Sequence, residues 1–212
     1  MKLIFHLSVL WAVLSLGGPL YMSVFGNINF DSDWRTADRS SVGIAPNPTF
    51  VREAIVQVYA ARAFKWRGAF AVHTWLATKA EDAESFRVHE VLGWRLNSQQ
   101  PVVVSREAKP DRSWYGNPPE ILVDIRGDLA KELIPSIDSA VKSYPYPTNY
   151  TIWPGPNSNT FTAWIAREVP ELELNLPTTA IGKDYLPQGA LFATAPSGSG
   201  YQFSLAGMFG VI

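Results

Sequence analysis

Three side chains in this sequence have the types and spacing that nucleophilic catalysis would need. Ser158 is expected to open a helix, where free backbone N–H groups and the positive end of the helix dipole could hold an oxyanion. A serine hydroxyl becomes a good nucleophile when a neighbouring base takes its proton, and imidazole is the usual base. His73 is the candidate base, and His89 or Glu90 could orient it. Ser158, His73 and His89 therefore form the candidate catalytic set.

Each of these residues also has an ordinary structural interpretation. Serine is a preferred N-cap residue, and Asn157 or Asn159 could cap the same helix equally well. His73 could instead be a histidine with its hydrogen bonds satisfied on a half-buried face of the sheet. A structural role is the stronger interpretation for His89, which is close to Arg87 in the sequence. The spacing is compatible with catalysis but does not require it.

Metal and cofactor sites have little support in the sequence. The histidines and the carboxylates of Glu90 and Asp111 lack a tight ligand spacing such as His-x-x-x-His. The glycine-containing stretches 182–184 and 198–200 are too short for phosphate loops. The absence of cysteine excludes disulfides, thiolate zinc sites, iron–sulfur ligation and cysteine nucleophiles. We therefore expect neither a metal nor a cofactor.

Two stretches rich in proline and aromatic residues are candidates of another kind. Residues 114–119 and 144–147 carry aromatic side chains that could line a binding groove. Stretches of this composition more often pack on a core, and packing is the favoured interpretation here.

The positions of the histidines depend on two predicted strands. Apolar residues alternate along 70–76 and along 86–94, which is typical of strands. Residues 79–84 form a polar connection of hairpin length, so we expect the strands to pair with their even-numbered apolar residues in a common core. This register would place the side chains of His73 and His89 together on the other face.

The remaining pattern is that of a small α+β domain. Further strands are expected at 102–104 and 121–125, and also at 54–63, where β-branched and aromatic residues favour a strand over the alternative of an amphipathic helix. They give a sheet of four or five strands. Apolar residues recur at helical spacing from Leu129 to about Ser143, after a capping Asp128, and again from Ser158 to Pro170. The chain from Tyr201 onward is expected to form an edge strand or a tail on the core.

The N-terminal segment has the length and composition of a membrane helix. No charged side chain lies between Leu3 and Phe30, and 3–25 is long enough as a helix to cross a hydrocarbon core of about 30 Å. An uncleaved anchor is favoured over a signal peptide, although cleavage near Gly17 stays open, and a buried helix is the remaining alternative. The expected organisation is an anchor or signal segment at 1–26, a linker at 27–48 and a globular domain at 49–212.

The composition limits the classes of partner. A chain of 212 residues with 47% apolar content can build one domain with a short appendage. A formal net charge of -1, with 17% charged residues, supplies no basic field for nucleic acid. The expected partners are a membrane, through the N-terminal segment, and an unknown envelope substrate or protein.

Several blocks of the sequence resemble a known bacterial family. The blocks are Ala71-Val72-His73-Thr74-Trp75, residues 153–161, and Leu176-Pro177 followed by residues 180–185. They resemble the family catalogued as domain of unknown function 3750, over most of the chain from about Trp34. The resemblance implies a bacterial envelope protein without an assigned reaction.

A remoter resemblance concerns the start of the second predicted helix. Asn157-Ser158-Asn159-Thr160-Phe161 is similar to the nucleophile helix of circularly permuted papain-like proteins, including lecithin:retinol acyltransferases and related isopeptidases. In that group a strand histidine, a polar residue on the next strand and the helix-opening nucleophile follow one another, which carries over to His73, His89 and Ser158. The group has cysteine where this chain has Ser158, which implies a serine hydrolase or a site that has lost covalent chemistry.

We therefore expect an α+β domain of permuted papain-like type, with a small antiparallel sheet packed on helices behind an N-terminal membrane helix. The expected location is the bacterial inner membrane, with the globular domain in the periplasm. The expected function is a Ser158–His73 hydrolase or acyltransferase acting on amide or ester bonds. The alternative is a noncatalytic binding module that uses the same cleft, so enzymatic activity stays open.

Overall fold

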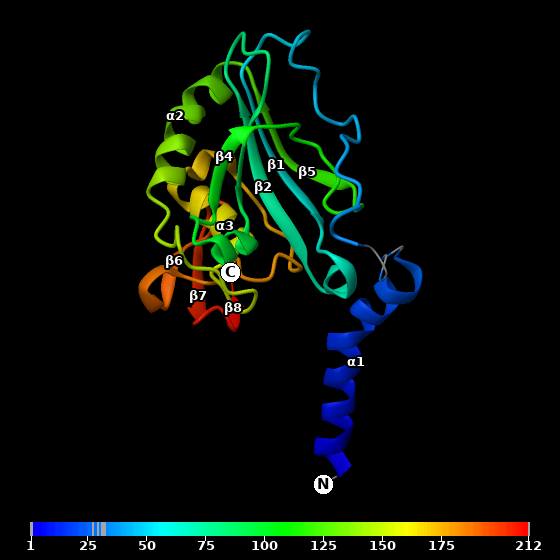
Figure 1. Cartoon of the computed structure of the whole chain (residues 1–212). Helices are drawn as coiled ribbons and strands as arrows, with labels where there is room; N and C mark the ends of the chain where they lie inside the picture. Colours follow the sequence, from blue (N-terminus) through cyan, green and yellow to red (C-terminus); the bar gives the residue numbers. More distant parts are fainter. Residues whose placement is uncertain (1, 27, 29, 31–32, 212) are drawn as a thin grey trace.

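A five-stranded antiparallel sheet, in the order β4-β3-β2-β1-β5, forms the centre of the computed structural model (Figure 1). The structure describes residues 2–26, 28, 30 and 33–211. The strands are β1 (Ile55–Arg62), β2 (Val72–Lys79), β3 (Arg87–Val91), β4 (Val103–Glu107) and β5 (Pro119–Arg126). The α+β class and the sheet size predicted from the sequence are confirmed.

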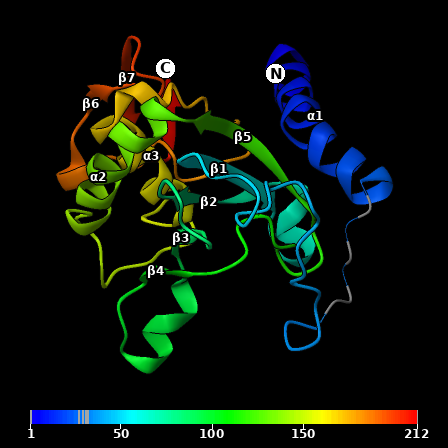
Figure 2. The same ribbon diagram turned by 90° about the horizontal axis from the view of Figure 1, so that it is seen from above.

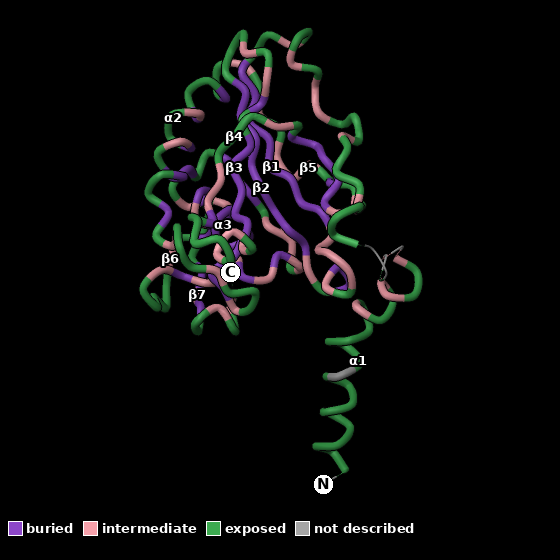
Figure 3. The backbone as a smooth tube through the Cα atoms, viewed as in Figure 1, coloured by how far each residue is buried: buried purple, intermediate pink, exposed green. Residues whose placement is uncertain are grey.

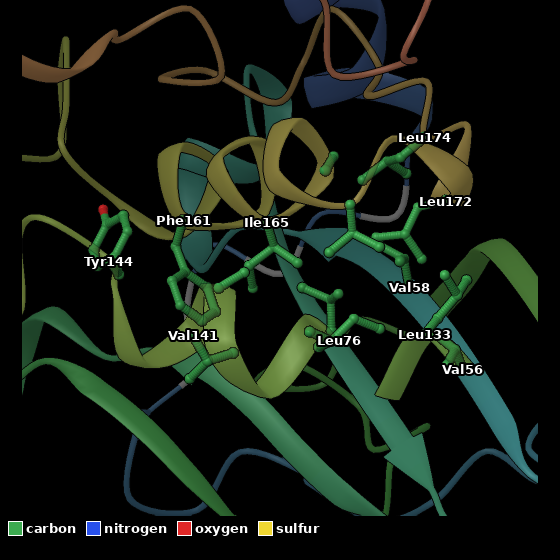
Figure 4. Packing of buried hydrophobic residues seen from close by; sticks show 14 of the residues in the cluster. Val56, Val58, Leu76, Leu133, Val141, Tyr144, Phe161, Ile165, Leu172 and Leu174 are labelled. Atoms are coloured by element: carbon green, nitrogen blue, oxygen red, sulfur yellow. The ribbon is translucent and has the colours of Figure 1, made fainter. Parts of the chain in front are cut away.

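Two helices, α2 (Asp128–Lys142) and α3 (Ser158–Glu168), pack on one face of this sheet (Figure 1). Their apolar stripes meet the even-numbered residues of β1 and β2, as the labelled side chains in Figure 4 show. The N-cap of α2 is Gly127, with a φ of 71°, so Asp128 lies in the first turn and does not cap the helix as predicted. Four short 3-10 helices complete the domain: η1 (Lys65–Ala69), η2 (Gly93–Ser98), η3 (Pro170–Leu172) and η4 (Pro187–Gly189).

The opposite face of the sheet is buried as well. Tyr59 and Trp75 stack there with ring centroids 5.6 Å apart, and Trp114 packs beside them from the loop at 108–118. The loop is held by a hydrogen bond from Trp75 Nε1 to the carbonyl of Pro110, at 2.8 Å. All residues of β2 are consequently buried, and Figure 3 shows the central strands in the colour of buried residues.

The predicted register between β2 and β3 is wrong by one residue. Leu76 lies opposite His89, and Ala77 lies opposite Val88. Because side chains alternate along a strand, this shift moves His89 to the face of Leu76 and leaves His73 on the other face. The apolar pattern could not settle the register, because both faces of the sheet bury apolar side chains. His73 and His89 therefore do not share a face.

A second sheet forms near the C-terminus, where the sequence predicted an edge strand or a tail. It consists of β6 (Phe192–Thr194), β7 (Tyr201–Leu205) and β8 (Phe209–Val211), in that order and antiparallel. Ala206 and Gly207 join β7 to β8 with φ values of 51° and 72°. Positive φ at two successive turn residues matches the twist of a tight hairpin.

The N-terminal helix α1 (Lys2–Phe25) projects from the domain, and its described side chains are mostly exposed (Figures 1 and 3). It is long and apolar enough to cross a membrane, a property that an N-terminal signal sequence shares. The described part of the predicted linker has bends and turns, and a bridge between Ser41 and Arg112 joins it to the loop at 108–118.

Candidate functional site

Ser158 is the first residue of α3, as the helical pattern predicted. The N-cap is Asn157, whose Oδ1 accepts hydrogen bonds from the backbone N–H groups of Asn159 (2.9 Å) and Thr160 (3.2 Å). Thr160 Oγ1 accepts a hydrogen bond in return from the Asn157 N–H, which completes a capping box. The Ser158 side chain is buried, and its hydroxyl makes no hydrogen bond within the described ranges. Ser158 is therefore not needed as the cap.

Asn159 fastens α3 to β2. Its Nδ2 donates to the carbonyls of Val72 (3.0 Å) and Ile181 (2.8 Å), and its Oδ1 accepts from Thr74 Oγ1 at 2.9 Å. Thr74 thus points toward α3. Successive side chains of a strand point to opposite faces, so His73 points away from α3.

His73 lies on the far side of β2 from Ser158. Its ring stacks on Trp114 with centroids 3.6 Å apart, and its Nε2 lies 3.9 Å from Glu90 Oε2. Burial lowers the pKa of His73, which favours the neutral ring. The structure therefore does not bring Ser158 and His73 together.

His89 occupies a third environment, on the face covered by α2. Its Nδ1 lies 2.9 Å from Ser105 Oγ, and its Nε2 lies 3.2 Å from Thr78 Oγ1 and 3.8 Å from Asp138 Oδ1. Burial lowers the pKa of His89 to about 4 and outweighs the opposing effect of Asp138. His89 is thus a neutral histidine with both ring nitrogens occupied.

Glu90 is the other residue that the sequence suggested as a partner of His73. Its carboxylate is fully buried on the same face of the sheet as His73. Arg112 Nη2 donates to its Oε2 at 2.5 Å, and Arg106 Nη2 donates to its Oε1 at 3.1 Å. Burial alone would raise the pKa of Glu90, but His73 and the two guanidinium groups outweigh it and lower the pKa to about 2. We call His73, Glu90, Arg106, Arg112 and Trp114 the Glu90 cluster.

A shallow hollow opens to solvent beside this cluster; its space is about 290 Å³ when the part open to solvent is included. We call it the Arg–Trp pocket, and its lining residues are Arg39, Leu92, Trp94, Arg106, Arg112, Ser113, Trp114 and Tyr115. Among the ion pairs of the described residues, its three guanidinium groups are opposed by one carboxylate, that of Glu90. The side chain of Arg39 lies over the Tyr115 ring at 4.4 Å and donates to the backbone carbonyls of Trp34 and Ala37. The pocket therefore carries an excess of positive charge.

Two buried nitrogen atoms at this place lack hydrogen-bond partners among the described residues. They are His73 Nε2 and Arg112 Nη1. Arg112 is nine-tenths buried, and its guanidinium lies 5.8 Å from the centroid of Trp114. A buried guanidinium N–H without an acceptor is costly. This arrangement can accept a negatively charged or oxygen-rich group.

Sequence reasoning found part of this site. Glu90 is a candidate partner of His73 in the sequence, and the aromatic stretch 114–119 is a groove candidate there, although packing on the core is the interpretation that its composition favours. The three arginines were missed because Arg39 is far in the sequence from Arg106 and Arg112. The sequence does contain one signal for this pocket: Arg112 and Trp114 alternate in a loop that is flanked by prolines. Within the described ranges, no group of three or more histidine, aspartate or glutamate side chains could hold a metal ion.

Comparison with known proteins identifies the family. A family model described as protein of unknown function (DUF3750) matches residues 53–185, which is more than half of the chain. The chain belongs to this family. The DUF3750 match contains the five-stranded sheet, α2, α3 and the Glu90 cluster, whereas α1, Arg39 and the sheet β6-β7-β8 lie outside it. No curated protein and no solved structure matches the chain.

Proposed function

We propose that this protein is a membrane-anchored binding domain of the bacterial envelope that holds a small anionic ligand in the Arg–Trp pocket. In this proposal α1 lies in the inner membrane and the DUF3750 domain lies in the periplasm. The apolar, exposed surface of α1 and the absence of charge from Leu3 to Phe30 support the anchor.

The buried Arg112 guanidinium is the observation that carries the binding proposal. Its Nη2 is held by Glu90, while its Nη1 has no partner in the described part of the chain. Glu90 fixes the guanidinium plane, so Nη1, which is buried here, is a preorganised donor for an acceptor that enters when the neighbouring side chains of the pocket move aside. A ligand oxygen would remove the cost of the unpaired donor.

The lining predicts the chemistry of the ligand. Guanidinium groups bind carboxylate and phosphate groups through paired N–H donors. The rings of Trp94, Trp114 and Tyr115 favour a flat or apolar body next to the anionic group. The hollow is shallow and open to solvent, so it suits a small anionic group or the end of a single side chain, with the rest of the ligand lying outside it.

The test is a titration of the full-length chain in phosphatidylcholine nanodiscs with benzoate, acetate and inorganic phosphate, followed by calorimetry. We expect benzoate to bind more tightly than acetate because its ring reaches the aromatic wall. Arg39→Gln and Arg112→Lys should each weaken benzoate binding by about tenfold, the effect of about 1.4 kcal/mol. Arg87→Gln, an exposed arginine outside the pocket, is the matched control. Absence of binding by all three probes, or variants that bind as wild type does, would refute the proposal.

A hydrolase or acyltransferase acting on amide or ester bonds is the second candidate. Its support is the unpartnered Ser158 hydroxyl at the start of α3, together with the papain-like order of His73, His89 and Ser158 along the chain. The permuted papain-like fold belongs to this candidate. A base other than His73 would have to serve Ser158, because β2 separates the two residues.

A further inference from the structure

The sheet β6-β7-β8 has one apolar and one polar face, and it is the apolar face that is turned away from the domain toward solvent. Cross-strand pairs such as Phe192 with Phe203 and Leu205 with Phe209 place alternate residues on one face. We call this the outer face, and its residues are Phe192, Thr194, Tyr201, Phe203, Leu205, Phe209 and Val211. Six of these seven side chains are apolar or aromatic.

The inner face of the same sheet is polar and fastened to the domain. Gln202 accepts a hydrogen bond from Arg167 at 2.5 Å and donates to the Asp184 carboxylate. Ser204 Oγ donates to the backbone carbonyl of Asp184. Gln202 and Ser204 are fully buried in these contacts. The polar contacts fix the orientation of the sheet, so the apolar side must face outward.

The outer face is exposed and lies in a region without charge. Tyr201 is 79% exposed, Phe192 is 69% exposed and Phe209 is 58% exposed. No Asp, Glu, Lys or Arg occurs from Tyr185 to Ile212. Soluble proteins usually protect exposed strands with charges, and a continuous exposed apolar patch indicates a binding surface. The missing charges favour a lipid surface over a polar protein partner.

The position of the outer face agrees with this occupant. Figure 1 places β6, β7 and β8 at the lower end of the domain, the end from which α1 descends, and Figure 2 places them with α1 along the upper side of the view. The exposed Trp66 of η1 lies at the end of the domain next to α1. Tyrosine and tryptophan are enriched where proteins meet the headgroup region.

We propose that the outer face of β6-β7-β8 rests on the bilayer in which α1 is anchored, with phospholipid as its occupant. The contact is apolar and aromatic, so it does not need anionic lipid. It gives the domain a second attachment point and a fixed orientation on the membrane. This inference rests on α1 as the membrane anchor, but it is independent of the ligand in the Arg–Trp pocket.

The absence of cysteine makes a direct test possible, because single cysteines can carry a nitroxide label. The full-length variants Phe192→Cys and Leu205→Cys report on the outer face. Leu14→Cys in α1 reports on the anchor, and Glu84→Cys, an exposed site between β2 and β3, is the aqueous control. Each labelled chain is reconstituted in phosphatidylcholine bilayers, and its collision rates with oxygen and with a water-soluble nickel chelate are measured. Thermal melting confirms that each variant is folded.

We expect a several-fold higher oxygen-to-nickel ratio at Phe192→Cys and Leu205→Cys than at Glu84→Cys. A ratio equal to that of Glu84→Cys, with Leu14→Cys in lipid, would overturn the inference and leave the anchor intact. Spin–spin broadening at Leu205→Cys without lipid exposure would show that a second copy covers the face instead. An aqueous Leu14→Cys would overturn the anchor and this inference together.

Discussion

The Ser158 hydroxyl has a helix N-terminus beside it but no adjacent imidazole. His73 stacks on Trp114 across the sheet, and both nitrogens of His89 are engaged by Ser105 and Thr78. A serine without a base is a weak nucleophile. The same hydroxyl also does not cap α3, because Asn157 has that role.

A fluorophosphonate probe tests the chemistry of this residue. We expect no labelling of the wild-type chain, because no base among the described residues is placed to deprotonate Ser158. Mass spectrometry of the treated protein is the measurement. Labelling that disappears in Ser158→Ala would establish the hydrolase, whereas labelling that disappears in Ser105→Ala would move the nucleophile to the serine beside His89.

The buried His89 predicts a pH-dependent stability. The unfolded chain binds a proton at this residue near pH 6.5, but the folded chain binds it at about pH 4. The unfolded state therefore holds more protons between these values, and the free energy of unfolding falls as the pH is lowered. At pH 5 this residue should cost about 2 kcal/mol relative to pH 7. Urea unfolding of wild type and His89→Gln at both pH values measures it. A loss of equal size in the two proteins would contradict the assignment.

At the scale of elements, the contact between α3 and β2 rests on buried side-chain hydrogen bonds. Asn159 makes three of them, to Val72, Ile181 and Thr74. Thr74 Oγ1 also lies 2.9 Å from Thr162 Oγ1 and can accept the Thr162 hydroxyl proton. The residues of the Asn157–Phe161 block that suggested a catalytic motif thus hold the helix on the sheet.

Substitutions at two neighbouring residues distinguish the structural role of Asn159 from that of the Ser158 hydroxyl. Asn159→Ala leaves buried carbonyls unpaired and should lower the free energy of unfolding by about 2 to 3 kcal/mol. Ser158→Ala removes a hydroxyl that has no partner in the described chain and should change it by less than about 0.5 kcal/mol. Denaturant unfolding of both variants gives the comparison. A Ser158→Ala variant as unstable as Asn159→Ala would show that the hydroxyl has a structural role that we have not identified.

At the scale of the whole molecule, α1 is the candidate membrane anchor. A helix that is apolar on all sides has no face to bury against the domain, and its described side chains are exposed. We expect the full-length protein to stay in the membrane pellet after washing with high salt and with carbonate, and its N-terminus to begin at Met1 or Lys2. Release by either wash would contradict the anchor, and an N-terminus near Gly18 would establish a cleaved signal peptide.

The sequence alone determined the features that depend on local patterns. The apolar N-terminal segment, the five strands and the two helices follow from hydrophobic periodicity, because each pattern reports which side of one element is buried. The family was also readable from short blocks such as residues 153–161, which lie within the DUF3750 match.

Tertiary structure alone decided which side chains meet. A shift of one residue between β2 and β3 exchanges the faces of a strand, and the periodicity could not resolve it in a sheet buried on both sides. That shift separated His73 from His89 and placed His73 beside Glu90. The Arg–Trp pocket likewise joins Arg39 to Arg106 and Arg112, and such long-range contacts leave no local pattern in the sequence. The candidate site was therefore set by register and chain packing, which no single element encodes.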